Sequence, residues 1–377
     1  MPPDDCVTAR ADRILLVLPS LDRGGGERVL LQLARLFLAA GREVHVASLL
    51  GGGPLRSEIP SAAVLHELVS PSHPVRGFVL ACQTFPRLVS LLRAIKPDAV
   101  LSTLTGTNLL TAVACMLARG RVRLVLREAS SIVNTRSAFK RRAMRWVYRR
   151  ADTIVAVSDG VADDLRGLGL PGDRIRVIRN PVDLVRLRHL AGVGPMLPEI
   201  GGTPYIIALG RLTEAKDYQT LLRAYVYSEL RRSHRLLIVG EGEQRVVLEG
   251  IVRDLDIADC VLFPGALDNP FRMLADASLL VLSSRWEGYP NVLLEALALN
   301  VPVVSTDCRH GPRELLGDGR YGRLVPVGDA VSLARAMEAE LLHPSQCSPA
   351  ILESHSPQFI ASEYLIALDD AYVGCPQ

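Results

Sequence analysis

Two glutamates, Glu287 and Glu295, are the residues whose type and spacing most clearly suggest chemistry. Glu287 follows an apolar run, in a loop with Gly288 and Pro290, and Glu295 falls inside the helical pattern that this loop begins. Carboxylates accept paired hydrogen bonds from vicinal hydroxyl groups. The spacing therefore predicts that Glu287 reaches toward a sugar, while Glu295 reaches toward a more distant diol.

A second group of residues brings positive charge to one turn. Gly210 and Arg211 follow an apolar run, and Lys216 comes shortly after them, just ahead of a helical pattern. An arginine fork and a lysine point charge that flank a turn can neutralise a diphosphate and stabilise it as a leaving group. The alternative is a solvated pair of surface cations.

The third candidate is a glycine-rich turn. Gly24, Gly25, Gly26 and Glu27 stand between an apolar run and a clear helical pattern. Glycines let the backbone approach a ligand closely, and the free amides at a helix start attract an anion such as phosphate. The turn matches neither the dinucleotide fingerprint nor a P-loop. The alternative is a tight turn without a ligand.

These turns need a scaffold of strands and helices. Short apolar runs alternate with longer helical patterns along the chain, which is typical of parallel sheets with crossover helices. The 377 residues, 49% hydrophobic and 22% charged, predict two folded α/β domains. The expected strands are Arg13–Leu18, Glu43–Leu49, Asp98–Leu101, Leu124–Leu126, Thr153–Val157, Ile175–Ile178, Tyr205–Leu209, Leu236–Val239, Val261–Phe263, Leu279–Leu282, Val303–Ser305 and Arg323–Val325.

The same alternation of apolar runs and helical patterns predicts where the domains end. We expect a first domain over residues 1–183 and a second over 204–355. Residues 184–203 are rich in glycine and proline and are expected to form the linker. Residues 356–377 carry a helical pattern without a strand, and this helix is expected to cross back to the first domain.

Charge and cysteine content exclude several classes of protein. The net charge of +3 is too small to indicate nucleic-acid binding. The seven cysteines have the spacing of neither a disulfide framework nor a zinc site, which favours a reducing compartment. Asp254 and Asp256 fall on a helical pattern and are interpreted as a solvated face rather than metal ligands. No metal and no cofactor are expected.

The chain carries no obvious membrane-targeting segment. Residues 1–12 lack the positive start and apolar centre of a signal peptide. No apolar run reaches the roughly 18 to 20 residues that a spanning helix needs. We therefore expect a cytoplasmic protein, with any membrane contact peripheral and on the inner face.

Residues 136–150 hold seven cations and no acid. Phe139, Ala143, Trp146 and Val147 recur at helical spacing, which predicts a basic amphipathic helix. It could lie on an anionic lipid surface or bind an acidic acceptor; the alternative is that the apolar residues pack inside while the cations are merely solvated. The residues expected to face the membrane are Arg136, Lys140, Arg141, Arg142, Arg145 and Trp146.

These motifs together resemble those of the retaining glycosyltransferases of family 4. The match includes the two glutamates, the Gly210 to Lys216 turn, the run from Val239 to Gly242 and the Gly24 to Glu27 turn, in the family's order. The runs at 157–161, 180–183 and 322–326 agree as well. The resemblance implies the GT-B fold, in which two Rossmann-like domains face each other across a cleft.

The resemblance also implies roles for residues. The second domain would hold the nucleotide-sugar donor: Glu295 at the ribose, Arg211 and Lys216 at the diphosphate, and Glu287 at the transferred sugar, without metal. The catalytic residues would be Glu287, Arg211 and Lys216. The donor-binding residues would be Glu295, Gly210, Glu241, Gly242, Pro264, Gly265, Gly288, Asn291, Val292, Gly311 and Arg313.

A narrower resemblance concerns residues 306–314 and 101–108, which are similar to the branch acting on polyprenyl-diphosphate-linked glycans. It implies transfer of a hexose or N-acetylhexosamine from a UDP-sugar to a lipid-linked acceptor, in the assembly of a surface polysaccharide or a glycoprotein glycan. For residues 311–314 the alternative is a proline-bounded turn. The acceptor and phosphate loops would contain Gly24, Gly25, Gly26, Glu27, Thr105, Asn108, Arg127 and Glu128.

Two positions depart from the family pattern. Arg127 and Glu128 stand where many relatives have a histidine, so either one takes its place or the two pair with each other. Asn300 stands where relatives usually have glycine. Two other functions remain open: a catalytically silent nucleotide-sugar-binding partner, and a sugar-nucleotide epimerase on the same fold.

Overall fold

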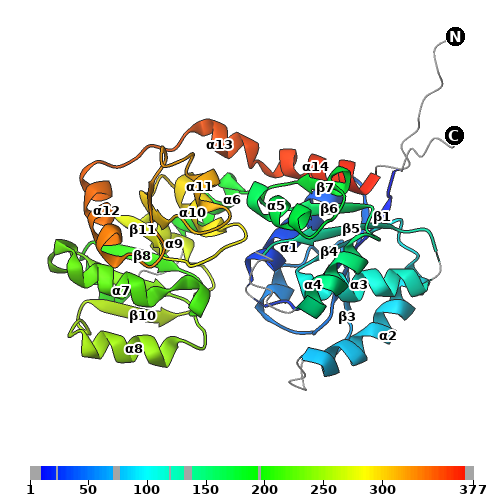
Figure 1. Cartoon of the computed structure of the whole chain (residues 1–377), viewed down its shortest axis with the longest axis horizontal. Helices are drawn as coiled ribbons and strands as arrows, with labels where there is room; N and C mark the ends of the chain where they lie inside the picture. The colour runs from blue at the N-terminus through cyan, green and yellow to red at the C-terminus, as the bar shows by residue number, and fades with distance from the viewer. Residues whose placement is uncertain are drawn as a thin grey trace, which may run out of the picture. The chain divides into compact units, whose positions relative to one another are not determined.

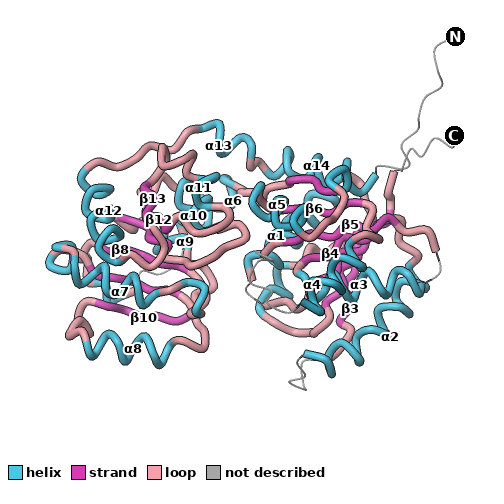
Figure 2. The backbone as a smooth tube through the Cα atoms, in the orientation of Figure 1, coloured by secondary structure: helices cyan, strands magenta, loops and turns pink. Residues whose placement is uncertain are grey.

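The computed structural model describes residues 10–22, 24–70, 77–118, 120–130, 138–193 and 197–369 (Figures 1 and 2). The chain forms two compact units. The first contains Met1–Pro181 and Pro357–Gln377, and the second contains Val182–Ser356. Each unit is built on a parallel sheet, whose strands are magenta in Figure 2.

The first unit contains a seven-stranded sheet in the order β3-β2-β1-β4-β5-β6-β7, with parallel pairing throughout. Its central strands are almost wholly apolar because helices cover both faces of the sheet. The strands are β1 (Arg13–Leu18), β2 (Glu43–Ser48), β3 (Val64–Glu67), β4 (Ala99–Thr103), β5 (Arg123–Glu128), β6 (Thr153–Ala156) and β7 (Ile175–Val177).

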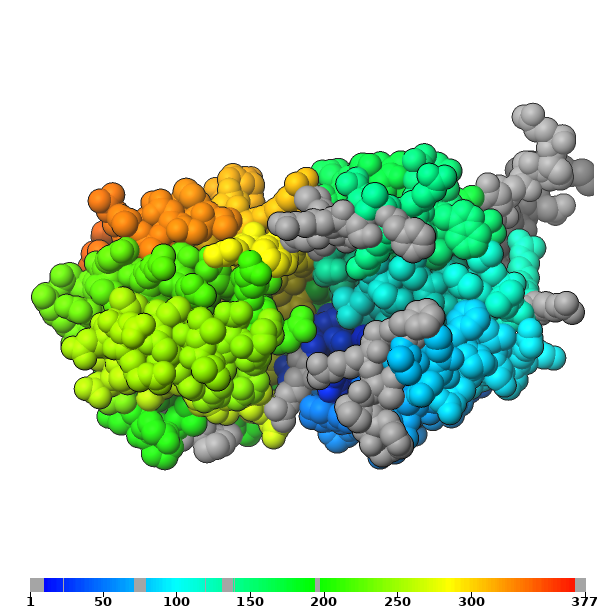
Figure 3. Space-filling view, turned by 60° about the horizontal axis from the view of Figure 1, so that its bottom comes forward, coloured from blue at the N-terminus to red at the C-terminus, as the bar shows by residue number. Residues whose placement is uncertain are grey.

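The helices of this unit form two layers. Helix α14 packs beside α1 in one core, whereas α3 contacts both α2 and α4. Helices α2 and α3 lie at the surface of the unit, in light blue to cyan in Figure 3. The helices are α1 (Gly25–Ala39), α2 (Gly77–Ile95), α3 (Thr105–Ala118), α4 (Ala138–Tyr148), α5 (Asp159–Gly167) and α14 (Pro357–Asp369), with short 3-10 helices η1 (Pro54–Glu58) and η2 (Gly172–Arg174).

The second unit contains a six-stranded parallel sheet in the order β10-β9-β8-β11-β12-β13. Its strands are β8 (Tyr205–Leu209), β9 (Arg235–Val239), β10 (Val261–Gly265), β11 (Leu279–Leu282), β12 (Val303–Thr306) and β13 (Arg323–Val325). Its helices are α6 (Leu184–Gly192), α7 (Tyr218–Tyr227), α8 (Arg245–Asp254), α9 (Phe271–Ala275), α10 (Asn291–Ala298), α11 (Pro312–Leu315), α12 (Ala330–Leu342) and α13 (Pro349–Ser354), with η3 (Pro198–Ile200), η4 (Glu214–Lys216) and η5 (Glu229–Arg232).

Two sequence-based expectations need correction. Strand β3 was not expected, because it is a short, partly exposed edge strand without an apolar run. The expected linker at residues 184–203 begins with helix α6, which belongs to the second unit and packs against α9. Asp183 caps this helix by accepting the Arg186 amide at 3.0 Å, and the glycines and prolines of the expected linker begin only at its last residue, Gly192.

Helix α14 returns the chain to the first unit, where Ile360, Tyr364 and Leu368 are buried in the core. Polar contacts fix its end. The Asp369 carboxylate accepts hydrogen bonds from the Ala11 amide at 2.8 Å and from Arg42 at 2.5 Å. The first unit is therefore completed by a segment that follows the second unit in the sequence.

We expect Leu368→Ala to lower the free energy of unfolding of the first unit by about 2–5 kcal/mol, because the leucine is 1% exposed and its removal leaves a cavity. Ile366→Ala on the same helix is the control, since Ile366 is 49% exposed and its loss should cost less than about 1 kcal/mol. Urea unfolding in a Trp286→Phe background, where Trp146 alone reports on the first unit, measures both. Equal losses would contradict the docking of α14.

Candidate functional site

The candidate residues of the second unit stand in loops at the carboxyl ends of its strands. The sheet order reverses between β8 and β11. Lys216 follows β8, and Glu287 follows β11. Loops on the two sides of such a switch point diverge and leave a crevice, which is where open α/β sheets bind ligands.

Lys216 and Glu287 form an ion pair at this point. Lys216 Nζ lies 2.6 Å from Glu287 Oε1, and the two side chains are only 18% and 12% exposed. The Ser284 hydroxyl donates to the same carboxylate oxygen at 2.6 Å. Within the described chain, the second oxygen of Glu287 has no partner, so it can accept a hydrogen bond from a ligand.

Arg211, the other cation of this turn, is available to bind an anion. Its side chain is exposed and pairs with no acid in the described part of the chain. The predicted turn thus combines one engaged cation, Lys216, with one that is available to an anion. This arrangement differs from two solvated surface cations, because the lysine is largely buried and ion-paired.

Close backbone contacts explain the glycines around Arg211. A Cβ atom on Gly240 would lie 1.9 Å from the Gly210 carbonyl oxygen, and one on Gly242 would lie 2.3 Å from the Leu212 carbonyl oxygen. The Leu212 amide donates to the Glu241 carbonyl at 2.9 Å. The loops after β8 and β9 are therefore locked together, and only glycine fits at these positions.

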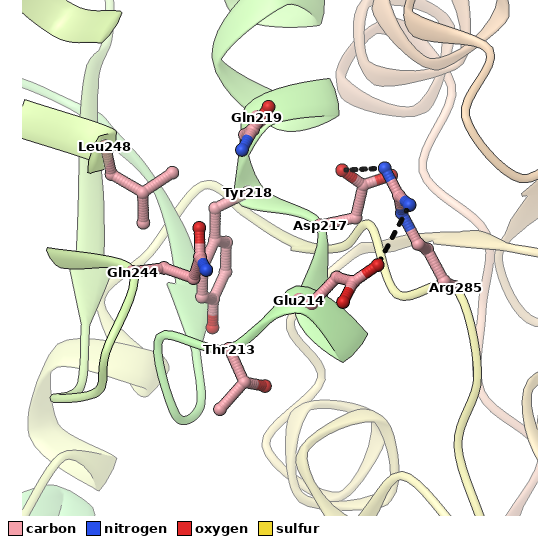
Figure 4. A pocket seen from close by; sticks show the side chains of 8 residues that line it. All are labelled: Thr213, Glu214, Asp217, Tyr218, Gln219, Gln244, Leu248 and Arg285. Atoms are coloured by element: carbon pink, nitrogen blue, oxygen red, sulfur yellow. Dashed lines mark hydrogen bonds and ion pairs between the residues drawn. The ribbon is translucent and has the colours of Figure 1, made fainter. Parts of the chain in front are cut away.

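An acid and an arginine that were not among the sequence-based candidates brace the same turn (Figure 4). Asp217 has a left-handed backbone (φ 45°) and is buried. Arg285 Nε lies 3.1 Å from Asp217 Oδ2, and a second nitrogen lies 3.5 Å from Glu214. These contacts hold the Lys216 turn against the loop of Glu287. In the sequence, the only sign of this contact is that Asp217 directly follows Lys216, and hydrophobic periodicity does not detect such a sign.

Glu295 is half-buried in α10, one turn after Asn291 and on the same side of the helix. Val292 is also half-buried, whereas Gly288 is buried. Asn300, just beyond the end of α10, has φ 58°. Glycine and asparagine are the residues that tolerate this left-handed position best, which accounts for an asparagine here.

The remaining donor-site candidates lie in the loop after β9, at the end of β10, in the loop after β12 and in α11. Glu241 is paired with Arg245 at 2.6 Å and lies beside Gly265, which follows Pro264 in β10. Gly311 has φ 94°, and a Cβ there would lie 2.4 Å from Pro290. Arg313 is engaged by Asp307 and, at 3.5 Å, by Asp318. Arg313 would have to leave these acids to meet a phosphate.

In the first unit, the candidate loops also flank a switch point, which lies between β1 and β4. The glycines Gly24, Gly25 and Gly26 follow β1, and Thr105 and Asn108 follow β4. A Cβ on Gly24 would lie 1.9 Å from a carboxylate oxygen of Glu27, so the Glu27 side chain folds back over the start of α1.

Arg127 is fully buried beneath this turn. Its guanidinium donates to the side-chain oxygens of Thr103 at 2.8 Å, Asn180 at 2.6 Å and Tyr364 at 3.1 Å. A Cβ on Gly26 would lie 3.7 Å from Arg127 Nη1. No acid in the described chain pairs with this charge.

Glu128 is buried in a different network. Its carboxylate accepts hydrogen bonds from Tyr148 at 2.6 Å, Ser130 at 2.9 Å and Thr105 at 3.0 and 3.1 Å. Burial raises the pKa of Glu128, although these hydroxyls oppose the shift. Arg127 and Glu128 therefore do not pair with each other within the described residues, which corrects one of the two alternatives for this position.

The expected basic helix corresponds to α4. Lys140, Arg141, Arg142 and Arg145 are exposed, and Arg136 lies outside the described residues. Trp146 is 50% exposed and stacks under Arg150 at 4.9 Å, whereas Met144, Val147 and Tyr148 are buried. Val147 therefore packs inside, as the alternative to membrane contact expected, whereas Trp146 does not.

Within the described ranges, no three metal-binding side chains gather in a way that could hold an ion. Likewise, none of the helices described above is both long and apolar enough to cross a membrane.

Comparisons with known proteins agree with the motifs. Residues 23–186 match the family Glycosyltransferase Family 4, and residues 203–343 match Glycosyl transferases group 1. A similar protein is the N-acetylgalactosamine-N,N'-diacetylbacillosaminyl-diphospho-undecaprenol 4-alpha-N-acetylgalactosaminyltransferase of Campylobacter jejuni, with 29% identity over 85% of this chain and 88% of that protein. The lipopolysaccharide core biosynthesis glycosyltransferase LpsE of Rhizobium meliloti is 31% identical over 60% of this chain and 64% of that protein.

Similar solved structures show the same fold. HepE of Anabaena in complex with UDP-glucose matches with a TM-score of 0.72 and 19% identity, over 95% of each chain. The apo form of the lipopolysaccharide outer core galactosyltransferase WaaB matches with a TM-score of 0.68 and 17% identity, over 94% of this chain and 98% of that chain. The two Rossmann-like units are therefore those of a GT-B fold.

We expect Gly240→Ala to lower the free energy of unfolding of the second unit by about 3 kcal/mol or more, because its Cβ would collide with the Gly210 carbonyl. Gly250→Ala in α8 is the matched control, since a Cβ there meets nothing closer than 3.9 Å, and it should stabilise the helix by about 0.5–1 kcal/mol. Urea unfolding followed by Trp286 in a Trp146→Phe background measures both. Similar effects of the two alanines would contradict the tight contact.

Proposed function

Because the chain belongs to the glycosyltransferases of family 4, we propose that it moves a hexose or N-acetylhexosamine from a UDP-sugar to a polyprenyl-diphosphate-linked glycan, with retention and without metal. The acceptor class is supported by the Campylobacter relative, whose name describes a diphospho-undecaprenol substrate. The donor class is supported by the likeness to HepE, which binds UDP-glucose. The product would serve the assembly of a surface polysaccharide or a glycoprotein glycan.

The observation that carries the proposal is the Lys216–Glu287 pair beside the open Arg211. As the bond between sugar and diphosphate breaks, negative charge grows on the leaving oxygen. A preplaced lysine and arginine stabilise that charge most where it develops. The free oxygen of Glu287 would accept a sugar hydroxyl, and Glu295 the ribose diol.

The exposed side of the first unit is proposed to meet the acceptor at the inner face of the membrane. Helix α4 presents Lys140, Arg141, Arg142 and the half-exposed Trp146. Cations near an anionic surface contribute about 1 kcal/mol each, and an interfacial tryptophan adds an apolar anchor. A protein that extends a lipid-linked glycan has to work at that surface.

The test of the reaction is UDP release from a panel of UDP-sugars with EDTA, with and without membrane extract that contains polyprenyl-linked glycans. We expect acceptor-dependent turnover, and Arg211→Gln should lower it about 10²–10³-fold because one cation is lost from the leaving group. Arg223→Gln, at an exposed position on α7, is the control and should retain activity.

Three outcomes would contradict the proposal. Loss of turnover with EDTA would show that a metal is required. Conversion of the UDP-sugar without an acceptor would indicate an epimerase. Nucleotide binding without turnover, with any donor or acceptor tested, would indicate a silent partner.

Membrane contact predicts weaker vesicle binding when the cations of α4 are removed. The triple variant Lys140→Gln, Arg141→Gln and Arg142→Gln should partition about 100-fold less onto vesicles with phosphatidylglycerol, as expected for three cations at about 1 kcal/mol each. The control neutralises Arg223, Arg231 and Arg253, three exposed arginines of the second unit. Sedimentation with the vesicles measures the partitioning of both variants. Equal partitioning would contradict membrane binding through α4.

A further inference from the structure

Tyr289 and His355 form a buried pair in the second unit. Their side chains are 7% and 4% exposed, and the rings stack with centroids 5.9 Å apart and an interplanar angle of 29°. The Tyr289 hydroxyl is hydrogen-bonded to Nε2 of His355. Neither residue was singled out by the sequence motifs, although Tyr289 stands two positions after Glu287.

Tyr289 belongs to the loop that carries the candidate sugar-binding residues. The Glu287 amide donates to the Arg309 carbonyl, and the Asn291 amide donates to the Tyr289 carbonyl at 3.0 Å. Gly311 packs against the backbone of the loop, since a Cβ there would lie 3.3 Å from Tyr289 Cα. The backbone is thus fixed by neighbouring loops, and the tyrosine side chain reaches away from them to His355.

His355 lies at the end of the second unit, and its backbone also contacts the residue at which the unit begins. Its carbonyl accepts the Val182 amide at 2.8 Å. Val182 is the first residue of the unit and Ser356 the last. Both crossings between the units are therefore joined by one hydrogen bond at His355.

The hydrogen bonds of the His355 ring show which ring nitrogen carries the hydrogen. Nδ1 lies 2.6 Å from the Ile351 carbonyl, which can only accept, so this nitrogen carries the hydrogen. In the neutral ring, Nε2 is then the acceptor and the Tyr289 hydroxyl donates. Both ring nitrogens are used, so the ring cannot turn without losing a bond.

We propose that Tyr289 and His355 are positioning residues. When the donor binds at the Glu287 loop, they stabilise the hydrogen bond between the Val182 amide and the His355 carbonyl, where the chain enters and leaves the second unit. The inference rests on the proposed function, since the donor is the ligand that would bind to Glu287 in this loop. A phenylalanine would fill the space of Tyr289 equally well. The hydroxyl adds the link to His355, and through the His355 backbone to Val182.

The test is hydrogen exchange of the full chain, with and without UDP, followed in peptides that contain Val182. In the native protein, UDP should slow exchange there about threefold to tenfold, the range of one net hydrogen bond. In Tyr289→Phe, UDP should still bind with a Kd within about threefold, yet the slowing at Val182 should disappear. Tyr227→Phe is the control, because Tyr227 is 61% exposed, and it should behave as the native protein.

Steady-state kinetics separate positioning from structure. Tyr289→Phe should lower kcat while the donor KM stays near the native value, and its melting temperature should fall below that of Tyr227→Phe only by the amount expected for one lost buried hydrogen bond. If Tyr289→Phe fails to fold, His355→Gln takes its place, with the same expected loss of slowing at Val182. UDP binding with unchanged slowing at Val182 in the variant would overturn this inference alone. Failure of the native protein to bind any uridine nucleotide would overturn the proposed function, and this inference with it.

Discussion

The contact between Lys216 and Glu287 imposes the strictest requirement on the second unit. The two residues come from loops after β8 and β11, which lie side by side although β9 and β10 separate them in the sequence. A partly buried ion pair contributes little net stability, because desolvation offsets the attraction. The pair is therefore held by its surroundings rather than by its own attraction, through the glycines at 240 and 242, the Asp217–Arg285 contact and the Gly311 turn.

The sequence was informative where chemistry and periodicity coincide. Buried parallel strands such as β8 and β11 are continuous apolar runs, and the loops that follow them carry the family motifs, so both were predictable. Strand β3 was missed because it is a short, partly exposed edge strand without an apolar run. The partners of Arg127, Glu128 and Tyr289 were out of reach for another reason. Apart from the one between Ser130 and Glu128, these hydrogen bonds join residues far apart in the chain, and no local pattern encodes such a contact.

The first unit contains two buried charges that no opposite charge among the described residues balances, unlike the candidate site of the second unit. In the second unit, cations and acids are paired or open to solvent at the edge of the sheet, as with Lys216 and Arg211. In the first unit, Arg127 and Glu128 are both enclosed and satisfied by neutral hydroxyl and amide groups. A buried charge that loses one such partner becomes costly. These two networks therefore specify the local structure of the first unit more than they offer free groups to a ligand.

One partner of Arg127 is Tyr364 of α14, and this has a consequence for how the protein is made. Domains commonly fold one after another as the ribosome delivers them, with the N-terminal one first. Here the first unit lacks α14, and Arg127 lacks one of its three partners, until the entire second unit has been synthesised. The second unit, whose residues are contiguous, can close as soon as it emerges. Until α14 follows, the part of the first unit's core that Ile360, Tyr364 and Leu368 complete is left uncovered.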